Sequence, residues 1–165
     1  VNEVLDRFFT AASEAVLQYG GVVDKFVGES LLAVFGWPAG AQDDAINTVT
    51  CARVLQAAFT RLRAEWQGSL GTAPALSIGI GHGLVIGGSI GSIQHQDYTV
   101  FGDAVDIAFS LSERAHGGET LISQSLTAQL REPLEGITFD EFPPIKVGDD
   151  AVEHEIVLMR TDATS

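Results

Sequence analysis

Residues 20–36 read GGVVDKFVGESLLAVFG, and this stretch decides the fold. Two apolar runs, residues 22–27 and 31–35, flank a short turn at Gly28, Glu29 and Ser30. β-Branched and aromatic residues on both sides of a tight, glycine-containing connection predict a β-hairpin.

The charges of this hairpin have two interpretations. Strand alternation predicts that Val23, Lys25 and Val27 share one face. A lysine inside an apolar strand must be solvated, paired or directed at an anion. Glu29 lies at the predicted hairpin tip. Together, Lys25 and Glu29 could bind a phosphate-bearing ligand and its metal. The same residues also suit an edge hairpin with solubilising charges.

Composition narrows the class of protein. A chain of 165 residues predicts one domain, and 45% hydrophobic with 19% charged residues is enough for a folded core. A net charge of −13, with only Lys25 and Lys146 as lysines, argues against nucleic acid or a membrane surface as the main partner. No apolar run is long enough to span a membrane. The single cysteine, Cys51, excludes an internal disulfide and fits a cytoplasmic protein.

Helical and strand periodicities alternate along the rest of the chain. They predict helices over residues 1–20, 41–67 and 104–116, a short helix ending near 131, and strands over 75–80, 84–90, 120–123, 137–142 and 153–160. Residues 92–99 are expected to connect to the helix at 104, and Pro143-Pro144 to separate the last two strands. This pattern predicts an α+β fold with helices packed on a sheet.

A second stretch, QDYTVFGDAV at residues 96–105, makes the pattern more specific. The two stretches resemble two signatures of class III nucleotide cyclase catalytic domains, G-G-x-V-D-K-F-x-G-D-x-x-(M/L)-A-x-F-G and x-D-Y-T-V-x-G-D-x-V-N-x-A-A-R-L. The resemblance extends from Val1 to about Met159. It implies a single cyclase-homology domain over residues 1–165, with a ferredoxin-like core and a mixed or antiparallel sheet flanked by helices. It also implies a strand before residue 1, carrying the first metal-binding aspartate, which is missing from the sequence.

The resemblance implies a reaction. Such domains convert a nucleoside triphosphate to a 3′,5′-cyclic nucleotide and pyrophosphate, as in ATP to cyclic AMP, in cyclic-nucleotide signalling. They use two divalent cations, Mg²⁺ or Mn²⁺, and form the site between two subunits. A homodimer, or a heterodimer with another cyclase domain, is therefore expected.

This chain matches the family at some positions of the site and departs from it at others. Lys25 and Thr99 match the purine-reading positions, a combination typical of adenylate rather than guanylate cyclases. Glu29 stands at the second metal carboxylate, where the family has aspartate. Asp106 stands where the family has the ribose-orienting asparagine, and Ser110 where it has the arginine that stabilises the transition state.

These departures leave two functions open. The first is an adenylate cyclase with weak or no activity by itself, because losing such an arginine typically costs about a thousandfold in phosphoryl transfer. Arg114, one helical turn beyond Ser110, is a candidate replacement. The second is a catalytically degenerate domain that serves as a nucleotide-binding, regulatory or dimerisation module. An unrelated α+β domain is a third alternative.

Overall fold

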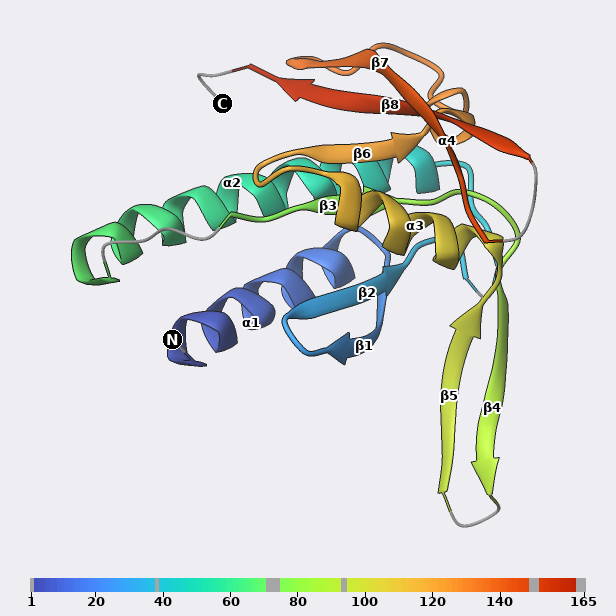
Figure 1. Cartoon of the computed structure of the whole chain (residues 1–165), viewed down its shortest axis with the longest axis horizontal. Coiled ribbons are helices and arrows are strands. Elements are labelled where there is room, and N and C mark those ends of the chain that lie inside the picture. The colour runs from blue at the N-terminus through green and yellow to red at the C-terminus, as the bar shows by residue number, and fades with distance from the viewer. Residues whose placement is uncertain (1, 38, 71–74, 93–94, 149–151, 163–165) are drawn as a thin grey trace.

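The computed structural model describes residues 2–37, 39–70, 75–92, 95–148 and 152–162 (Figure 1). In chain order the elements are α1 (Asn2–Gln18), β1 (Val22–Val27), β2 (Ser30–Val34), α2 (Asp44–Leu70), β3 (Ile78–Ile80), β4 (Ile86–Ser92), β5 (His95–Phe101), α3 (Asp103–Arg114), β6 (Thr120–Ser123), α4 (Gln124–Thr127), β7 (Ile137–Lys146) and β8 (Glu153–Thr161). In this part of the chain no helix is long and apolar enough to cross a membrane.

The strands form one four-stranded sheet and two hairpins. The sheet has the order β3-β6-β8-β7, in which β3 runs parallel to β6 and the other neighbours are antiparallel. The β1–β2 and β4–β5 hairpins pair separately, and the β4–β5 arm projects away from the body of the molecule (Figure 1). The predicted α+β class, with a mixed sheet and flanking helices, is confirmed.

Two sequence expectations about strands are wrong. Residues 92–99 do not simply connect to α3, because most of them belong to β5, which pairs with β4 from Ile86 opposite Phe101 onward. β7 continues through Pro143-Pro144, where its register with β8 shifts between Phe142 and Ile145. Prolines are tolerated there because β7 is an edge strand and the shift interrupts the ladder.

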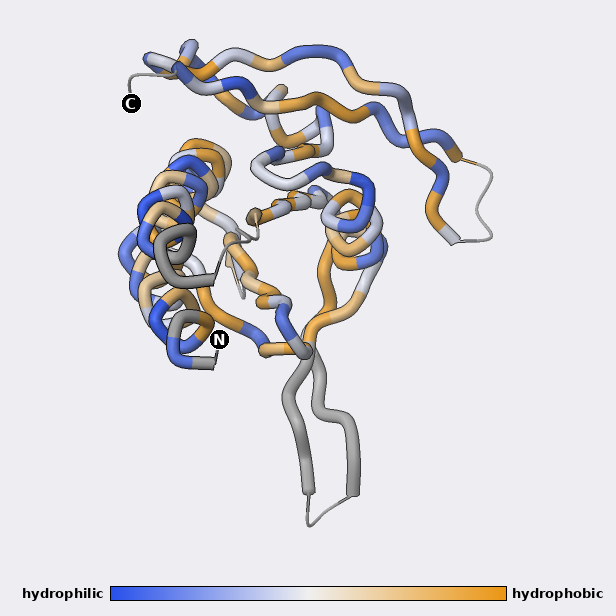
Figure 2. The backbone as a smooth tube through the Cα atoms, turned by 60° about the vertical axis from the view of Figure 1, so that its left-hand side comes forward, coloured by the Kyte–Doolittle hydropathy of each residue, from blue (hydrophilic) through white to orange (hydrophobic). Residues whose placement is uncertain are grey.

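The α1–α2 pair covers the β1–β2 hairpin and forms one part of the core. Phe8 of α1 meets Phe59 of α2 edge to face, with ring centroids 4.9 Å apart. Cys51 is 1% exposed and packs in the cluster that contains Val16 and Val23. Cys51 is thus a small core residue, and burial raises the pKa of its thiol to about 11. Figure 2 shows mainly hydrophobic strands running between helices whose outer sides carry many hydrophilic residues.

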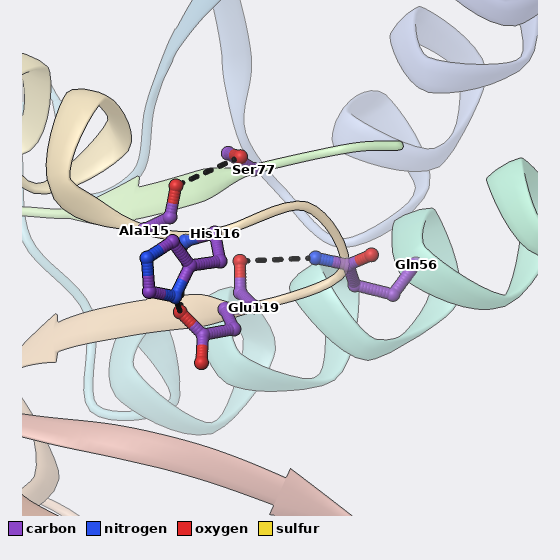
Figure 3. Close-up of polar contacts among 5 residues, drawn as sticks. All are labelled: Gln56, Ser77, Ala115, His116 and Glu119. Atoms are coloured by element: carbon purple, nitrogen blue, oxygen red, sulfur yellow. Dashed lines mark hydrogen bonds and ion pairs between the residues drawn. The ribbon is translucent and has the colours of Figure 1, made fainter. Parts of the chain in front are cut away.

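A set of polar contacts joins α2 to the ends of β3 and β6 (Figure 3). Gln56 Nε2 donates to the backbone carbonyl of Glu119 at 3.2 Å, and the Glu119 carboxylate accepts from the backbone N–H of His116 at 2.8 Å. Ser77 Oγ donates to the carbonyl of Ala115 at 3.2 Å. These bonds satisfy backbone groups in the turn after α3 and hold that turn beside α2.

Candidate active site

The register of the central hairpin shifts at Asp24. Val23 lies opposite Ala33, and the next pair is Lys25 opposite Leu32, so β1 has one extra residue at this point. Residues directly opposite each other share a face of the sheet. The shift therefore puts Lys25 on the opposite face from Val23, and the expected simple alternation is wrong here.

The two faces of the hairpin have different surroundings. Val23 and Ala33 pack in the cluster with Val16 of α1. The ring centroids of Phe26 and Phe9 are 5.1 Å apart. Lys25 belongs to the other face, and its side chain is 39% exposed. The candidate base-reading lysine therefore points away from the helical core.

Lys25 is paired with its neighbour. Its Nζ lies 3.4 Å from Oδ2 of Asp24, whose side chain is only 8% exposed. That Oδ2 atom is buried and accepts no hydrogen bond from the described residues. A buried carboxylate needs a compensating charge, and the Lys25 ammonium supplies one.

Glu29 lies in the turn between β1 and β2 and is exposed. Gly28 beside it has φ +60°, a left-handed conformation that suits glycine in so tight a turn. Among the described residues, no three His, Cys, Asp or Glu side chains lie together in a group that could hold a metal ion. The described residues therefore supply one carboxylate at an expected metal position and do not form a metal site by themselves.

Thr99 lies on β5 opposite Gly88, and its side chain lies outside the described parts of the chain. β1 contacts β5, so the strands that carry Lys25 and Thr99 are neighbours. Gly102 then leads into α3 with φ +141°, and a Cβ on it would lie 2.6 Å from the Leu84 carbonyl oxygen. The second signature thus needs glycine at this position for both conformation and space.

Three motif positions follow one another along α3. Asp106, Ser110 and Arg114 are spaced four residues apart along one row of α3, which runs beside the buried residues Ile107 and Leu111. The Asp106 side chain is exposed. Arg114 Nε donates to Ser110 Oγ at 3.3 Å, so the guanidinium turns back toward Ser110.

Sequence reasoning missed one feature of this surface. It gave no role to Asp24, because the register shift at this residue leaves no sign in the residue pattern.

Two grooves in the described part of the chain lie away from these residues. A groove of about 620 Å³ between α1 and α2 is lined by charged residues that include Arg7, Arg61 and Glu65. A second groove, of about 410 Å³, lies at the Pro143-Pro144 segment of β7. Neither of these two grooves is lined by a residue of the two signatures.

Comparison with known proteins identifies the family. The model of the adenylate and guanylate cyclase catalytic domain matches residues 1–157. The chain is 31% identical to adenylate cyclase 2 of Rhizobium meliloti (strain 1021) over 162 residues, which cover 94% of this chain and 40% of that protein. It thus spans less than half of that relative's length.

Solved structures of cyclases are similar to this chain as well. The adenylyl cyclase CyaB from P. aeruginosa superposes with a TM-score of 0.86 at 27% identity, over 98% of this chain and 82% of that chain. The guanylyl cyclase Cya2 superposes with a TM-score of 0.72 at 29% identity, over 96% of this chain and 78% of that chain. With both signatures, the surrounding fold and the matched residues in agreement, this chain belongs to the family of adenylate and guanylate cyclase catalytic domains.

Proposed function

We propose that this domain converts ATP to 3′,5′-cyclic AMP and pyrophosphate, at a rate well below that of family members with the full set of site residues. Membership of the family and similarity to two adenylate cyclases support this reaction. The observation that carries the proposal is the position of Lys25, on the open face of the central hairpin and on a strand that neighbours β5. We place the reaction in cyclic-nucleotide signalling in the cytoplasm.

The choice of ATP follows from hydrogen-bond chemistry. An ammonium can only donate, so Lys25 suits the acceptor N1 of adenine, whereas N1 of guanine carries a hydrogen. A threonine hydroxyl both donates and accepts, so Thr99 could accept from the exocyclic amino group of adenine. The similarity to a guanylyl cyclase makes GTP the alternative that a substrate test must include.

The expected low rate follows from α3. Phosphoryl transfer depends on positioning and on stabilising the charge of the triphosphate. Ser110 brings no charge, and the Asp106 carboxylate adds a negative one beside the polyphosphate. Arg114, turned toward Ser110, is the candidate cation, and it starts one helical turn, roughly 6 Å, further along the helix.

Class III cyclases generally use divalent metal ions, which neutralise polyphosphate charge when bound. Glu29 is the residue of the matched hairpin that would hold Mg²⁺ or Mn²⁺. We propose that a strand preceding α1 supplies the other carboxylate. In the described residues β2 pairs only with β1, and β3 only with β6, so each has an edge to which a strand could add.

We further propose that the site forms between two chains, as a homodimer or with another cyclase domain. Ile86 and Phe101 face each other at the base of the β4–β5 arm, and both are exposed apolar residues. Leu84 beside them is 82% exposed, and Phe109 on α3 is exposed as well. Exposed apolar groups of this kind are typical of a protein interface. A partner with asparagine and arginine on its α3 would restore the missing groups.

The test is product formation from ATP and from GTP in the presence of Mn²⁺, with the chain extended at its N-terminus. We expect slow formation of cyclic AMP and no cyclic GMP. The control is Asp24→Asn combined with Lys25→Met, which removes the lysine without leaving a buried charge, and it should abolish the preference for ATP. Turnover at rates ordinary for the family, or preference for GTP, would refute the proposal.

A second candidate function rests on Asp106 and Ser110. The departures from the family pattern fall at these catalytic positions, while the core and the structural glycines remain. If the folded chain binds nucleotide without turnover, the domain is a nucleotide-binding, regulatory or dimerisation module.

A further inference from the structure

Asp24 occupies the one irregular position of the central hairpin. Because β1 has an extra residue there, the pair Lys25–Leu32 directly follows the pair Val23–Ala33. Without this shift, alternation would put the Lys25 side chain on the face that packs against α1. The shift thus directs the lysine outward and leaves the neighbouring carboxylate close to its ammonium.

The Asp24 carboxylate is too well buried to be an ordinary surface charge. Its side chain is 8% exposed, and its Oδ2 accepts no hydrogen bond from the described residues and lies 3.4 Å from Lys25 Nζ. A buried carboxylate is destabilising unless a charge or donor compensates it. The two side chains therefore restrain each other.

We propose that Asp24 is a positioning residue that holds the Lys25 ammonium for base recognition and thereby sets the preference for adenine over guanine. The proposal rests on the proposed function, in which Lys25 reads the base. An ammonium has three hydrogens, so one directed at Asp24 leaves two for other acceptors. A restrained lysine presents these hydrogens in a fixed direction, which lowers the entropic cost of binding.

A double-mutant cycle tests the coupling. The affinities of ATP and GTP are measured by calorimetry for the wild type, Asp24→Asn, Lys25→Met and the double variant. We expect Asp24→Asn to weaken ATP binding about tenfold and to change GTP binding little. In the Lys25→Met background the same change should have no further effect, because Asp24 acts through the lysine. Equal effects in both backgrounds would overturn the proposal.

Asp140→Asn is the matched control. Asp140 also pairs with a cation, Arg160, at 2.7 Å, but both side chains are exposed and lie on β7 and β8. Its loss should leave both affinities unchanged. Asp24→Glu keeps the charge and serves as the second variant if Asp24→Asn does not fold; it should retain the preference for ATP. If Asp24→Glu folds but loses the preference for ATP, the NMR signal of Lys25 described below decides the outcome. A Lys25 signal that moves would restrict the role to a carboxylate at one strictly defined position. A Lys25 signal that does not move would overturn the proposal.

A readout without nucleotide separates this inference from the proposed function. The chain has two lysines, Lys25 and Lys146, so reductive ¹³C-methylation gives two lysine signals besides the terminal amine. Removal of the Asp24 charge should move the Lys25 signal and leave the Lys146 signal in place. An unmoved Lys25 signal would overturn the inference. A wild type that binds neither nucleotide, with a Lys25 signal that moves, would refute the proposed function and the role in base selection but leave the restraint of Lys25 by Asp24 established.

Discussion

At the scale of single residues, Ser110 is the departure with the largest expected effect on catalysis. In the resemblance to the second signature it stands where the family has an arginine, and its hydroxyl accepts a hydrogen bond from Arg114. We predict that Ser110→Arg raises the rate of cyclic AMP formation by roughly a hundredfold, because a positioned guanidinium stabilises phosphoryl transfer. The gain should stay below the full effect of an arginine while Asp106 remains. Ser112→Arg on the same helix is the matched control, and an equal gain there would show that charge alone is responsible.

Cys51 provides a residue-scale prediction about stability. Burial raises the pKa of its thiol from 9.0 to about 11. Between these values the unfolded chain loses the proton and the folded chain keeps it, so the free energy of unfolding falls as the pH rises above about 9, by up to roughly 1.4 kcal/mol per pH unit. Urea unfolding of the wild type and of Cys51→Ala, compared at pH 8 and pH 10, isolates this contribution. The difference between the two proteins should change with pH, and a constant difference would contradict the prediction.

At the scale of elements, the contact between β3 and α3 depends on glycine. A Cβ on Gly81 would overlap the Ala104 carbonyl oxygen, and one on Gly79 would overlap the backbone of α3 at Ala108. Since the obstacles are backbone atoms, α3 itself would have to move. We predict that Gly81→Ala lowers the free energy of unfolding by about 2–3 kcal/mol.

Gly40→Ala is the control for that change. It lies in the loop before α2, where a Cβ would meet only the Asp44 carboxylate at an ordinary 3.6 Å. Denaturant unfolding should show little loss for Gly40→Ala. Because α3 carries Asp106 and Ser110, Gly81→Ala should also change nucleotide binding. Equal free energies of unfolding for Gly81→Ala and Gly40→Ala would contradict the prediction, because they would mean that α3 shifts without cost.

At the scale of the whole molecule, the proposed site is shared between two chains. We predict that sedimentation velocity shows a concentration-dependent dimer and that the rate per chain rises with dimer fraction. Ile86→Lys, at the base of the β4–β5 arm, should shift the equilibrium toward monomer because it places a charge in an apolar contact. Leu17→Lys is the control, since Leu17 is exposed on α1. A chain that remains monomeric at high concentration would contradict the prediction.

Most elements could be predicted because their signals are local. β6 has the predicted bounds, and the hairpin of residues 20–36 forms as expected. β5 was missed because its partner β4 is rich in glycine and its own first residues, His95, Gln96 and Asp97, are polar, so neither strand shows the usual alternation. Pairing between the two strands defines them, and pairing is not visible in one strand's residues.

The sequence by itself determined the family, the α+β class and the positions at which this chain departs from the family pattern, because long ungapped motifs and hydrophobic periodicity are properties of residue order. The tertiary structure alone decided which way Lys25 points, that Asp24 is buried against it and that Arg114 turns back to Ser110. The physical reason is that one extra residue in a strand reverses every later side chain, and that a buried charge acquires its partner only when the surrounding elements exclude water.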